Sequence, residues 1–161
     1  MKRNYSKGLL ATLAFLGCGV AQQAWADKVV TSTAEHPLWF RILAERGNRY
    51  LTDNGTGAKF TGTTSTSPTD NMLWRFENNG DGTFSIVSKN GNYIDPAHVE
   101  VLTNAAKDKA FVAVTTHPSS GWTATEIANK ADYYIVNSGT TQLHQSNLSG
   151  NAIISYGGGS K

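Results

Sequence analysis

The sequence predicts an all-β domain, and two features of residues 27–161 carry that prediction. Apolar residues fall in short alternating runs of three to six positions, and turns rich in glycine and asparagine separate these runs. Alternation with a period of two is typical of half-buried strands, while Asn-Gly pairs favour tight turns. The expected class is therefore a β-barrel or β-sandwich. The runs lie at residues 39–43, 73–76, 84–87, 111–114, 133–136 and 152–156.

Helix is expected to be scarce, and residues 123–130 are the one segment with room for a turn or two. The turns are placed by local sequence, at Asn54-Gly55, at residues 79–82 and 90–92, and at Ser138-Gly139. Each of these supplies glycine or asparagine, which tolerate the backbone angles that reversals need.

Residues 1–26 have the layout of a signal peptide. Three basic residues precede an apolar run at 8–21, and small residues follow at Ala24 and Ala26. This pattern predicts cleavage after Ala26 and a secreted, periplasmic or cell-surface protein. The apolar run is shorter than the roughly 20 residues that cross a bilayer, and no later run is longer. We therefore expect no membrane span.

Cys18 leaves a second interpretation of the leader open. It is the chain's one cysteine, and it could be the lipidated residue of a bacterial lipoprotein, although Phe15 and Leu16 fit that motif poorly. Under either interpretation the exported domain has no disulfide, so its stability must come from core packing.

The charge of the exported part gives no reason to expect a nucleic-acid partner. Three of the 14 basic residues lie in the leader, which has no acidic residue, so eleven basic residues face twelve acidic ones afterwards. Nucleic-acid binding domains are usually strongly basic. The basic character of the whole chain is thus a property of its leader.

An internal repeat organises the rest of the chain. An aromatic-x-Ile strand at Phe40 recurs at Phe84 and Tyr133, and each is followed by a glycine-containing turn and a second short strand. Two units also close on a tryptophan, Trp74 and Trp122. Such a period predicts three units of about four strands that bury a shared core.

Residues 73–95 resemble the junction between repeats in ricin-B-type β-trefoil lectins. The leader resembles that of a secreted bacterial protein. In these lectins a Gln-x-Trp strand ends one unit, and an aromatic-x-Ile strand with a Gly-x-Tyr-Leu-Asp turn opens the next. The resemblance implies a β-trefoil at residues 38–161, with repeats at roughly 38–82, 83–130 and 131–161, after a lead-in at 27–37.

The chain departs from the family pattern at three places. Met72 and Ser120 replace the glutamine of Gln-x-Trp in units one and two, and unit three reaches the glycine-rich residues 157–161 before any closing strand. We therefore expect eleven strands rather than twelve, and an open barrel would expose unpaired backbone at the gap. Either the polypeptide continues, or unit three closes in an unusual way.

Enzymatic and metal-binding patterns are absent from the sequence. The four histidines are scattered without the spacing of a metal site, and residues 27–161 contain no thiol. A glycosidase needs two carboxylates at a set separation, and no such pair can be assigned. We expect no catalytic residues, no metal and no cofactor.

The resemblance to lectins implies sugar sites made of an aspartate after the second strand, an aromatic on the third, and an amide before the closing strand. The aspartate position falls on Thr52, Asp95 and His144, so only unit two matches, with Asp53 one residue away in unit one. Aromatic faces and carboxylates or amides are what sugar rings and hydroxyls require. The candidate glycan-binding residues are Asp53, Asn54, Phe60, Asn71, Asp95, Phe111, His117, Gln145 and Asn147.

The predicted function is a secreted, non-catalytic carbohydrate-binding module that targets a glycan-degrading enzyme to its substrate. Two alternatives remain open. The chain could be a protein-interaction or structural trefoil without sugar binding, or the N-terminal part of a secreted glycosidase. Three of the candidate glycan-binding residues also have a purely structural explanation. Phe60 and Phe111 lie on expected core strands, and Asp95 precedes Pro96 in an expected turn.

Overall fold

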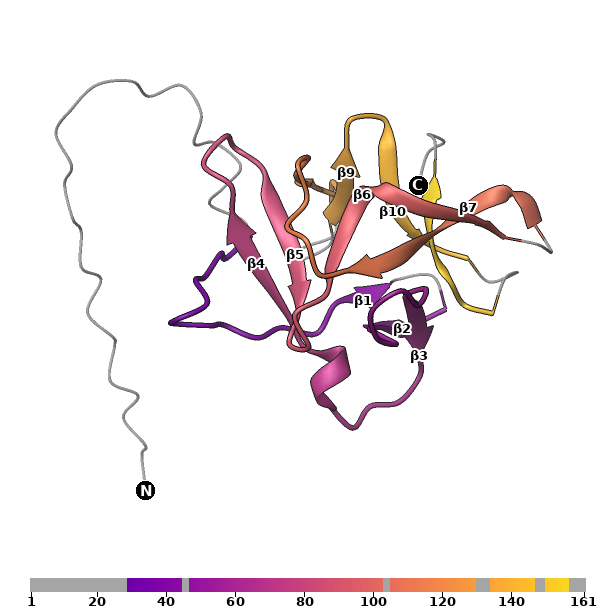
Figure 1. Cartoon of the computed structure of the whole chain (residues 1–161), viewed down its shortest axis with the longest axis horizontal. Helices are drawn as coiled ribbons and strands as arrows, with labels where there is room; N and C mark the ends of the chain where they lie inside the picture. The colour runs from indigo at the N-terminus through magenta and orange to yellow at the C-terminus, as the bar shows by residue number, and fades with distance from the viewer. Residues whose placement is uncertain (1–28, 45–46, 103–104, 130–133, 147–149, 157–161) are drawn as a thin grey trace, which may run out of the picture.

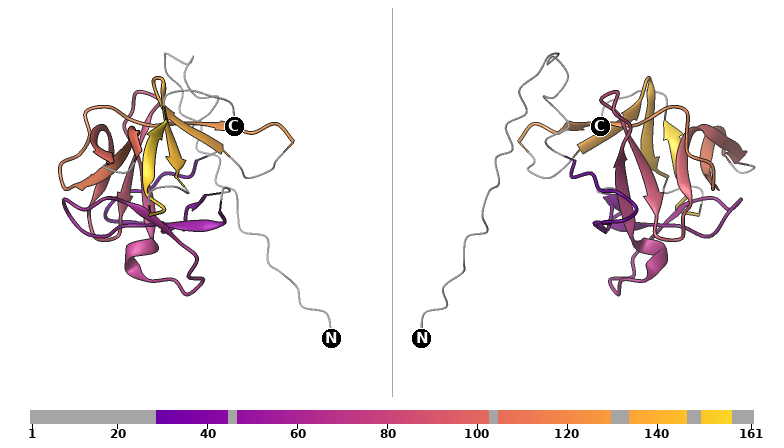
Figure 2. Two further views of the ribbon diagram at one scale, coloured as in Figure 1. Left: turned by 90° about the vertical axis from the view of Figure 1, so that its right-hand side faces the viewer. Right: turned by 60° about the vertical axis from the view of Figure 1, so that its left-hand side comes forward.

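The computed structural model describes residues 29–44, 47–102, 105–129, 134–146 and 150–156. The predicted leader, with Cys18, lies outside these residues. The strands wrap around a common centre instead of forming one flat sheet, as the rotated views show (Figure 2). The all-β prediction is confirmed.

Eleven strands and one short 3-10 helix, η1, make up the described chain (Figure 1). Unit one holds β1–β4, unit two holds β5–β8 and the described part of unit three holds β9–β11, which matches the predicted count. Residues 123–126 form a strand and not a helical turn. The elements are β1 (Leu43–Ala44), β2 (Arg49–Thr52), β3 (Thr61–Thr63), η1 (Asp70–Met72), β4 (Trp74–Asn78), β5 (Phe84–Ser88), β6 (Tyr93–Leu102), β7 (Ala105–Val114), β8 (Thr123–Glu126), β9 (Tyr134–Ser138), β10 (Thr141–Gln145) and β11 (Ile153–Tyr156).

The third strands of the three units meet around a pseudo-threefold axis. Phe60 N donates to Phe111 O at 3.2 Å, and Ile153 N donates to Phe60 O at 2.9 Å. Ala110 pairs with Ile154 between β7 and β11, which closes the ring. Phe60 and Phe111 are fully buried and Ile153 is 3% exposed. These three side chains therefore fill the centre that all units share.

The same register repeats in each unit. The second and third strands pair Leu51 with Gly62, Ile94 with Ala113, and Leu143 with Ser155. A one-residue slip would turn every side chain to the opposite face, so this agreement fixes which residues are equivalent. Leu51, Ile94 and Leu143 are equivalent, and each contributes to the main core cluster.

The first strand of unit three is shifted by one residue from the predicted repeat. The hairpins pair Leu43 with Tyr50, Val87 with Tyr93, and Asn137 with Gln142. Counting back three residues from the first member of each pair equates Phe40 and Phe84 with Tyr134, not with the predicted Tyr133. The residues at the Ile position are accordingly Ile42, Ile86 and Val136, and all three belong to the core.

A shorter turn explains the shift. Four residues separate the paired Asn137 and Gln142, whereas five separate the equivalent pair Val87 and Tyr93. Gly139 has a φ of 56°, which favours glycine. The prediction aligned the units by their aromatic spacing, and the loss of turn residues moved the true alignment by one position.

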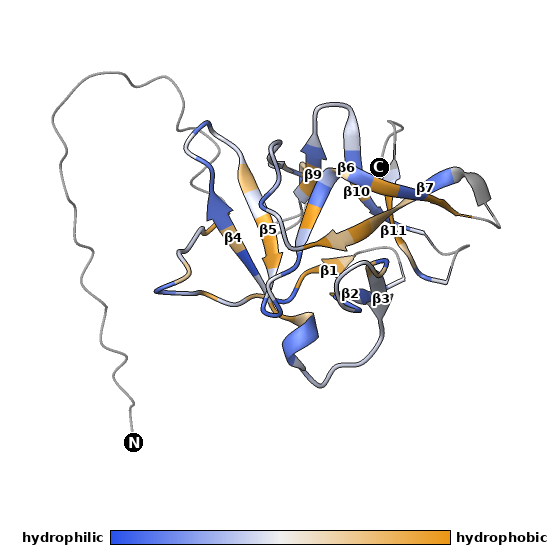
Figure 3. Ribbon diagram, in the orientation of Figure 1, coloured by the Kyte–Doolittle hydropathy of each residue, from blue (hydrophilic) through white to orange (hydrophobic). Residues whose placement is uncertain are grey.

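Two buried tryptophans anchor the core beneath the sheets. Trp74 and Phe60 pack edge to face with ring centroids 5.6 Å apart, and Trp122 and Phe111 do the same at 5.5 Å. Both tryptophans are fully buried. Apolar residues are concentrated on the core strands, as the hydropathy colouring of β5 and β7 shows (Figure 3).

Candidate functional site

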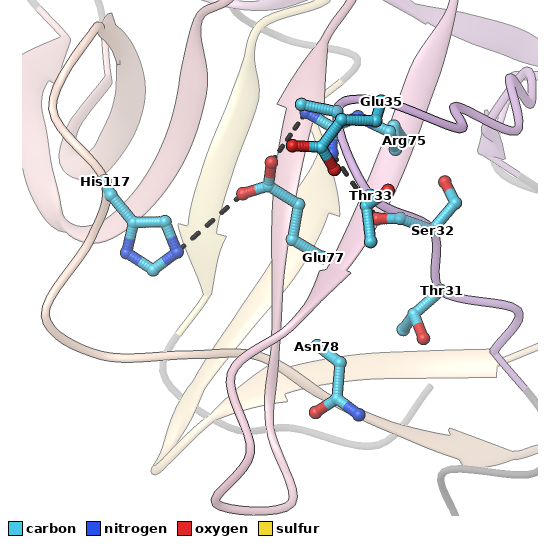
Figure 4. A pocket seen from close by; sticks show the side chains of 9 residues that line it. Thr31, Ser32, Thr33, Glu35, Arg75, Glu77, Asn78 and His117 are labelled. Atoms are coloured by element: carbon cyan, nitrogen blue, oxygen red, sulfur yellow. Dashed lines mark hydrogen bonds and ion pairs between the residues drawn. The ribbon is translucent and has the colours of Figure 1, made fainter.

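A polar hollow lies between the N-terminal segment and the outer face of β4 (Figure 4). Its volume is about 420 Å³, within the range of roughly 300–1,000 Å³ found for small-molecule sites. Nearly all of its side chains are polar or charged. The lining residues are Thr31, Ser32, Thr33, Ala34, Glu35, Arg75, Glu77, Asn78 and His117.

The alternation of β4 places the charged pair of this hollow. Side chains of a strand point to opposite faces in turn, so Trp74 and Phe76 face the core while Arg75 and Glu77 face outward. The N-terminal segment then covers this outer face, because Ser32 N donates to Phe76 O at 2.8 Å. The covered Arg75 side chain is only 8% exposed.

Glu77 is the centre of the hydrogen-bonding network. Its Oε1 lies 2.6 Å from Arg75 Nη2, and its Oε2 accepts a hydrogen bond of 3.1 Å from the Tyr93 hydroxyl. His117 Nε2 lies 3.8 Å from the same Oε2. One carboxylate thus joins β4 to β6 and lies beside the loop after β7.

Burial raises the pKa of the Tyr93 phenol above its ordinary value of 10.0, and the hydrogen bond to Glu77 and its charge raise the pKa further. The folded protein therefore holds this proton more tightly than the unfolded chain does. Because the unfolded phenol ionises first, the contribution of Tyr93 to stability is complete below pH 10 and is lost as the pH rises above it.

Replacing Tyr93 with phenylalanine should reduce the loss of stability between pH 9 and pH 11. Urea unfolding of the wild type and of Tyr93→Phe at several pH values in this range measures the difference, and the other tyrosines cancel in the comparison. Parallel pH dependences in the two proteins would contradict the role assigned to the Glu77 contact.

His117 is held by two further contacts. Its Nδ1 lies 2.9 Å from Pro118 O, which can only accept, so Nδ1 is the donor in that bond. Its Nε2 lies 3.1 Å from Ser85 Oγ, and its ring packs against Tyr93 at 5.3 Å between centroids. The imidazole is therefore fixed in orientation at one end of the hollow.

Ser85, His117 and Glu77 do not have the geometry of a hydrolytic triad. In such a triad the serine and the carboxylate address opposite nitrogens of the imidazole. Here both approach Nε2, while Nδ1 bonds to a backbone carbonyl. Ser85 is also fully buried, so a substrate could not reach its hydroxyl.

Arg75 links the hollow to its cover. Nη1 donates to Ser32 O at 3.4 Å, and the guanidinium carbon lies 5.9 Å from the centre of the half-buried Trp39 ring. Arg75 Nε is buried and has no hydrogen-bond acceptor among the described residues. A buried donor without an acceptor costs about 1–3 kcal/mol, which a ligand or water oxygen reaching it would recover.

Two predicted sugar-stacking residues are core residues instead. Phe60 and Phe111 are fully buried around the pseudo-threefold axis, and their rings pack against Trp74 and Trp122. A stacking platform must present a ring face to the ligand. Their prediction as glycan-binding residues was therefore wrong.

Asp53 is also internal, because it is 2% exposed. It accepts hydrogen bonds from Ser88 Oγ at 2.6 Å, Asn92 Nδ2 at 2.9 Å and Gly55 N at 2.8 Å. These bonds tie unit one to unit two and leave no access for a glycan. Its neighbour Asn54 donates to Lys59 O at 2.7 Å and so holds the same loop.

The remaining predicted residues are dispersed. Asp95 lies in β6 and not in the expected turn; it accepts from Ala97 N at 2.8 Å, where the register with β7 is irregular. Asn71 lies in η1 and accepts from Thr69 Oγ1. Gln145 is 3% exposed, so it cannot meet a glycan at the surface. Asn147 lies outside the described residues. Of the predicted residues, His117 alone lines the hollow.

Sequence reasoning missed Arg75, Glu77 and the segment at residues 31–35. The outward charged pair was visible, since it alternates with Trp74 and Phe76, but it was interpreted as part of a repeat junction. No sequence pattern near residues 31–35 indicates that this segment packs over β4, because the contact joins segments more than 40 residues apart.

Some other classes of site find no support among the described residues. They contain no group of three or more His, Cys, Asp or Glu side chains able to hold a metal ion. Nor does the described chain contain a helix long and apolar enough to cross a membrane.

Comparison with known proteins identifies the fold. No family model matches the chain, and no curated protein matches it. Among solved structures, a designed 3-fold symmetric protein, ThreeFoil, matches with a TM-score of 0.58 and 18% sequence identity. The match covers 76% of this chain and 91% of that one. The chain has a β-trefoil-like fold. At this identity the likeness establishes the fold alone, because one fold hosts unrelated functions.

Proposed function

We propose that the protein is an exported, non-catalytic carbohydrate-binding module whose ligand occupies the hollow above β4. The observation that carries the proposal is the lining of that hollow, where hydroxyl, carboxylate, guanidinium, amide and imidazole groups face one space of about 420 Å³. Such a set offers both donors and acceptors to a ligand that is itself covered with hydroxyl groups.

The geometry of the charged pair suits adjacent sugar hydroxyls. A carboxylate accepts two hydrogen bonds and a guanidinium donates several in one plane, so Glu77 and Arg75 side by side can contact two neighbouring oxygens. Trefoil lectins reach useful strength by engaging several weak sites, and weak binding in this hollow would likewise gain from avidity when copies of the chain are clustered.

A protein-interaction trefoil without sugar binding is the second candidate, and a specific observation favours it. The positions at which the resemblance implies glycan contacts are occupied by structural residues, with Asp53 buried and Asp95 bonded to the backbone within β6. The two candidates differ in whether the hollow binds a free glycan.

A glycan-array screen of the purified chain tests the proposal, with Glu77→Gln and Asp95→Ala variants alongside. Glu77→Gln keeps the shape of the side chain and removes its charge, so it is expected to weaken binding about tenfold or more. Asp95→Ala lies outside the hollow and should bind like the wild type. Near-UV circular dichroism checks that all three proteins are packed.

The outcomes separate the candidates. If the packed wild type binds no glycan, the protein-interaction function is favoured. If Asp95→Ala abolishes binding and Glu77→Gln does not, the ligand lies at the position implied by the lectin resemblance and not in the hollow.

A further inference from the structure

Three Asn-Gly pairs lie in turns of the described chain, and the same chemical modification is open to each. They are Asn54-Gly55, Asn79-Gly80 and Asn90-Gly91. The nitrogen of the residue after an asparagine can attack the side-chain amide carbon, and glycine leaves that nitrogen unhindered because it has no Cβ. The pairs share one local sequence, so a difference in their reactivity must come from the fold.

The side-chain amide of Asn54 is held inside its loop. Its Nδ2 donates to Lys59 O at 2.7 Å and to Thr61 Oγ1 at 3.0 Å. The amide carbon must turn onto Gly55 N to react, and both hydrogen bonds have to break first. The fold therefore slows the reaction at this pair.

Asn79 is held by two side chains. Its Nδ2 donates to Thr83 Oγ1 at 2.9 Å, and its Oδ1 accepts from Ser85 Oγ at 3.0 Å. Both ends of the amide are thus fixed, and the residue is half-buried. Reaction at Asn79 is slowed for the same reason as at Asn54.

Asn90, in the turn between β5 and β6, differs from both. Its side chain is exposed and makes no hydrogen bond to another described residue. The attacking nitrogen does not set this pair apart, since Gly91 N donates to Ser88 O at 2.9 Å much as Gly55 N donates to Asp53 Oδ1 at 2.8 Å. The free amide is the feature that distinguishes Asn90.

We propose that Asn90 is a site of spontaneous deamidation, which converts it to aspartate and isoaspartate. Gly91 N bonds to Asn90 Cγ, and Nδ2 leaves as ammonia with the proton that Gly91 N gives up. Water then opens the cyclic imide: its oxygen becomes part of a carboxylate, one proton returns to Gly91 N and the other goes to solvent. Breaking the Cγ–N bond gives aspartate, and breaking the bond from Gly91 N to the backbone carbonyl carbon gives isoaspartate. Neither step oxidises or reduces the chain.

Isoaspartate at this position weakens the link between units one and two. Its backbone runs through Cγ, so the turn gains one carbon between Ser88 and Asn92. Ser88 N donates to Asn92 O at 2.8 Å across this turn, and the two side chains donate to Asp53 Oδ2 at 2.6 and 2.9 Å. A longer backbone cannot keep all three bonds. Deamidation thus loosens this contact as the protein ages, whatever ligand the hollow binds.

The test incubates the purified full chain in a mildly alkaline buffer and locates deamidation by proteolysis and mass spectrometry. The reaction is detected as the mass gain of replacing NH2 by OH, and fragmentation distinguishes isoaspartate from aspartate. In the folded protein Asn90 should react about tenfold or more faster than Asn54 and Asn79, each of which must break two hydrogen bonds. Equal rates at the three pairs, or an unreactive Asn90, would overturn the proposal.

The unfolded chain is the control for local sequence. In urea that unfolds the protein, the three rates should agree within about threefold, because the contacts that separate the pairs are lost. If Asn90 kept its full advantage in urea, the difference would come from sequence and not from the fold, which would overturn the argument from hydrogen bonds.

Thr83→Val tests the protection directly. It keeps the shape of the side chain and removes the acceptor of Asn79 Nδ2, so the rate at Asn79 should rise about fivefold while the rate at Asn90 stays the same. An unchanged rate at Asn79 would show that this hydrogen bond does not protect the amide.

Asn90→Asp tests the consequence. It carries the charge of the product without lengthening the backbone, so it should unfold at the same urea concentration as the wild type. The isoaspartate fraction, separated by ion exchange, should unfold at a lower concentration. Equal midpoints for that fraction and the wild type would contradict the loosened contact between units one and two.

Discussion

Replacing Trp74 with alanine is expected to lower the free energy of unfolding by about 3–5 kcal/mol. The side chain is fully buried, packs edge to face on Phe60, and donates its indole N–H to Leu51 O. Its removal leaves a cavity beside the threefold axis and an unpaired carbonyl. Urea unfolding followed by circular dichroism measures the loss, and Trp122→Ala should give a similar value because its contacts are equivalent.

Trp74→Phe separates the contribution of ring packing from that of the indole hydrogen bond. The phenyl ring keeps most of the packing but leaves Leu51 O without its donor, so a loss of about 1–3 kcal/mol is expected. If Trp74→Ala unfolded at the same urea concentration as the wild type, Trp74 would not be part of a continuous core.

Most of the strands could be predicted because the alternation of apolar and polar residues in a strand, and the glycines of its turns, are visible in a short stretch of sequence. The inward faces follow from alternation at residues such as Phe84 and Ile86, and the turns follow from glycines such as Gly91, whose φ is 85°. The repeat added the arrangement of units, since no unit of four short strands can bury its own apolar face. The shift at Tyr134 escaped prediction because a shorter turn changed the alignment without changing the pattern.

The candidate site was harder to predict because it depends on contacts between distant segments. His117 reached the hollow from a loop, and its partners Glu77 and Tyr93 come from two other strands. Alignment to the lectin pattern instead selected Asp53 and Asp95, whose carboxylates bond within the fold. Residue type alone does not distinguish an aspartate that binds a ligand from one that holds two loops together.

Asp53 should therefore behave as a structural residue, and Asp53→Ala is expected to lower the free energy of unfolding by about 3 kcal/mol. Ser88 Oγ, Asn92 Nδ2 and Gly55 N all lose their acceptor in a place that water reaches poorly. Asp53→Asn should be nearly as damaging, because one of the carboxylate oxygens becomes a donor in a site built from donors. Asp95→Ala is the matched control: it removes one hydrogen bond at a more accessible position in β6 and should cost about 1 kcal/mol or less. Urea unfolding of the three variants checks the order, and equal losses for Asp53→Ala and Asp95→Ala would mean that the link between units one and two contributes no more to stability than a single exposed hydrogen bond.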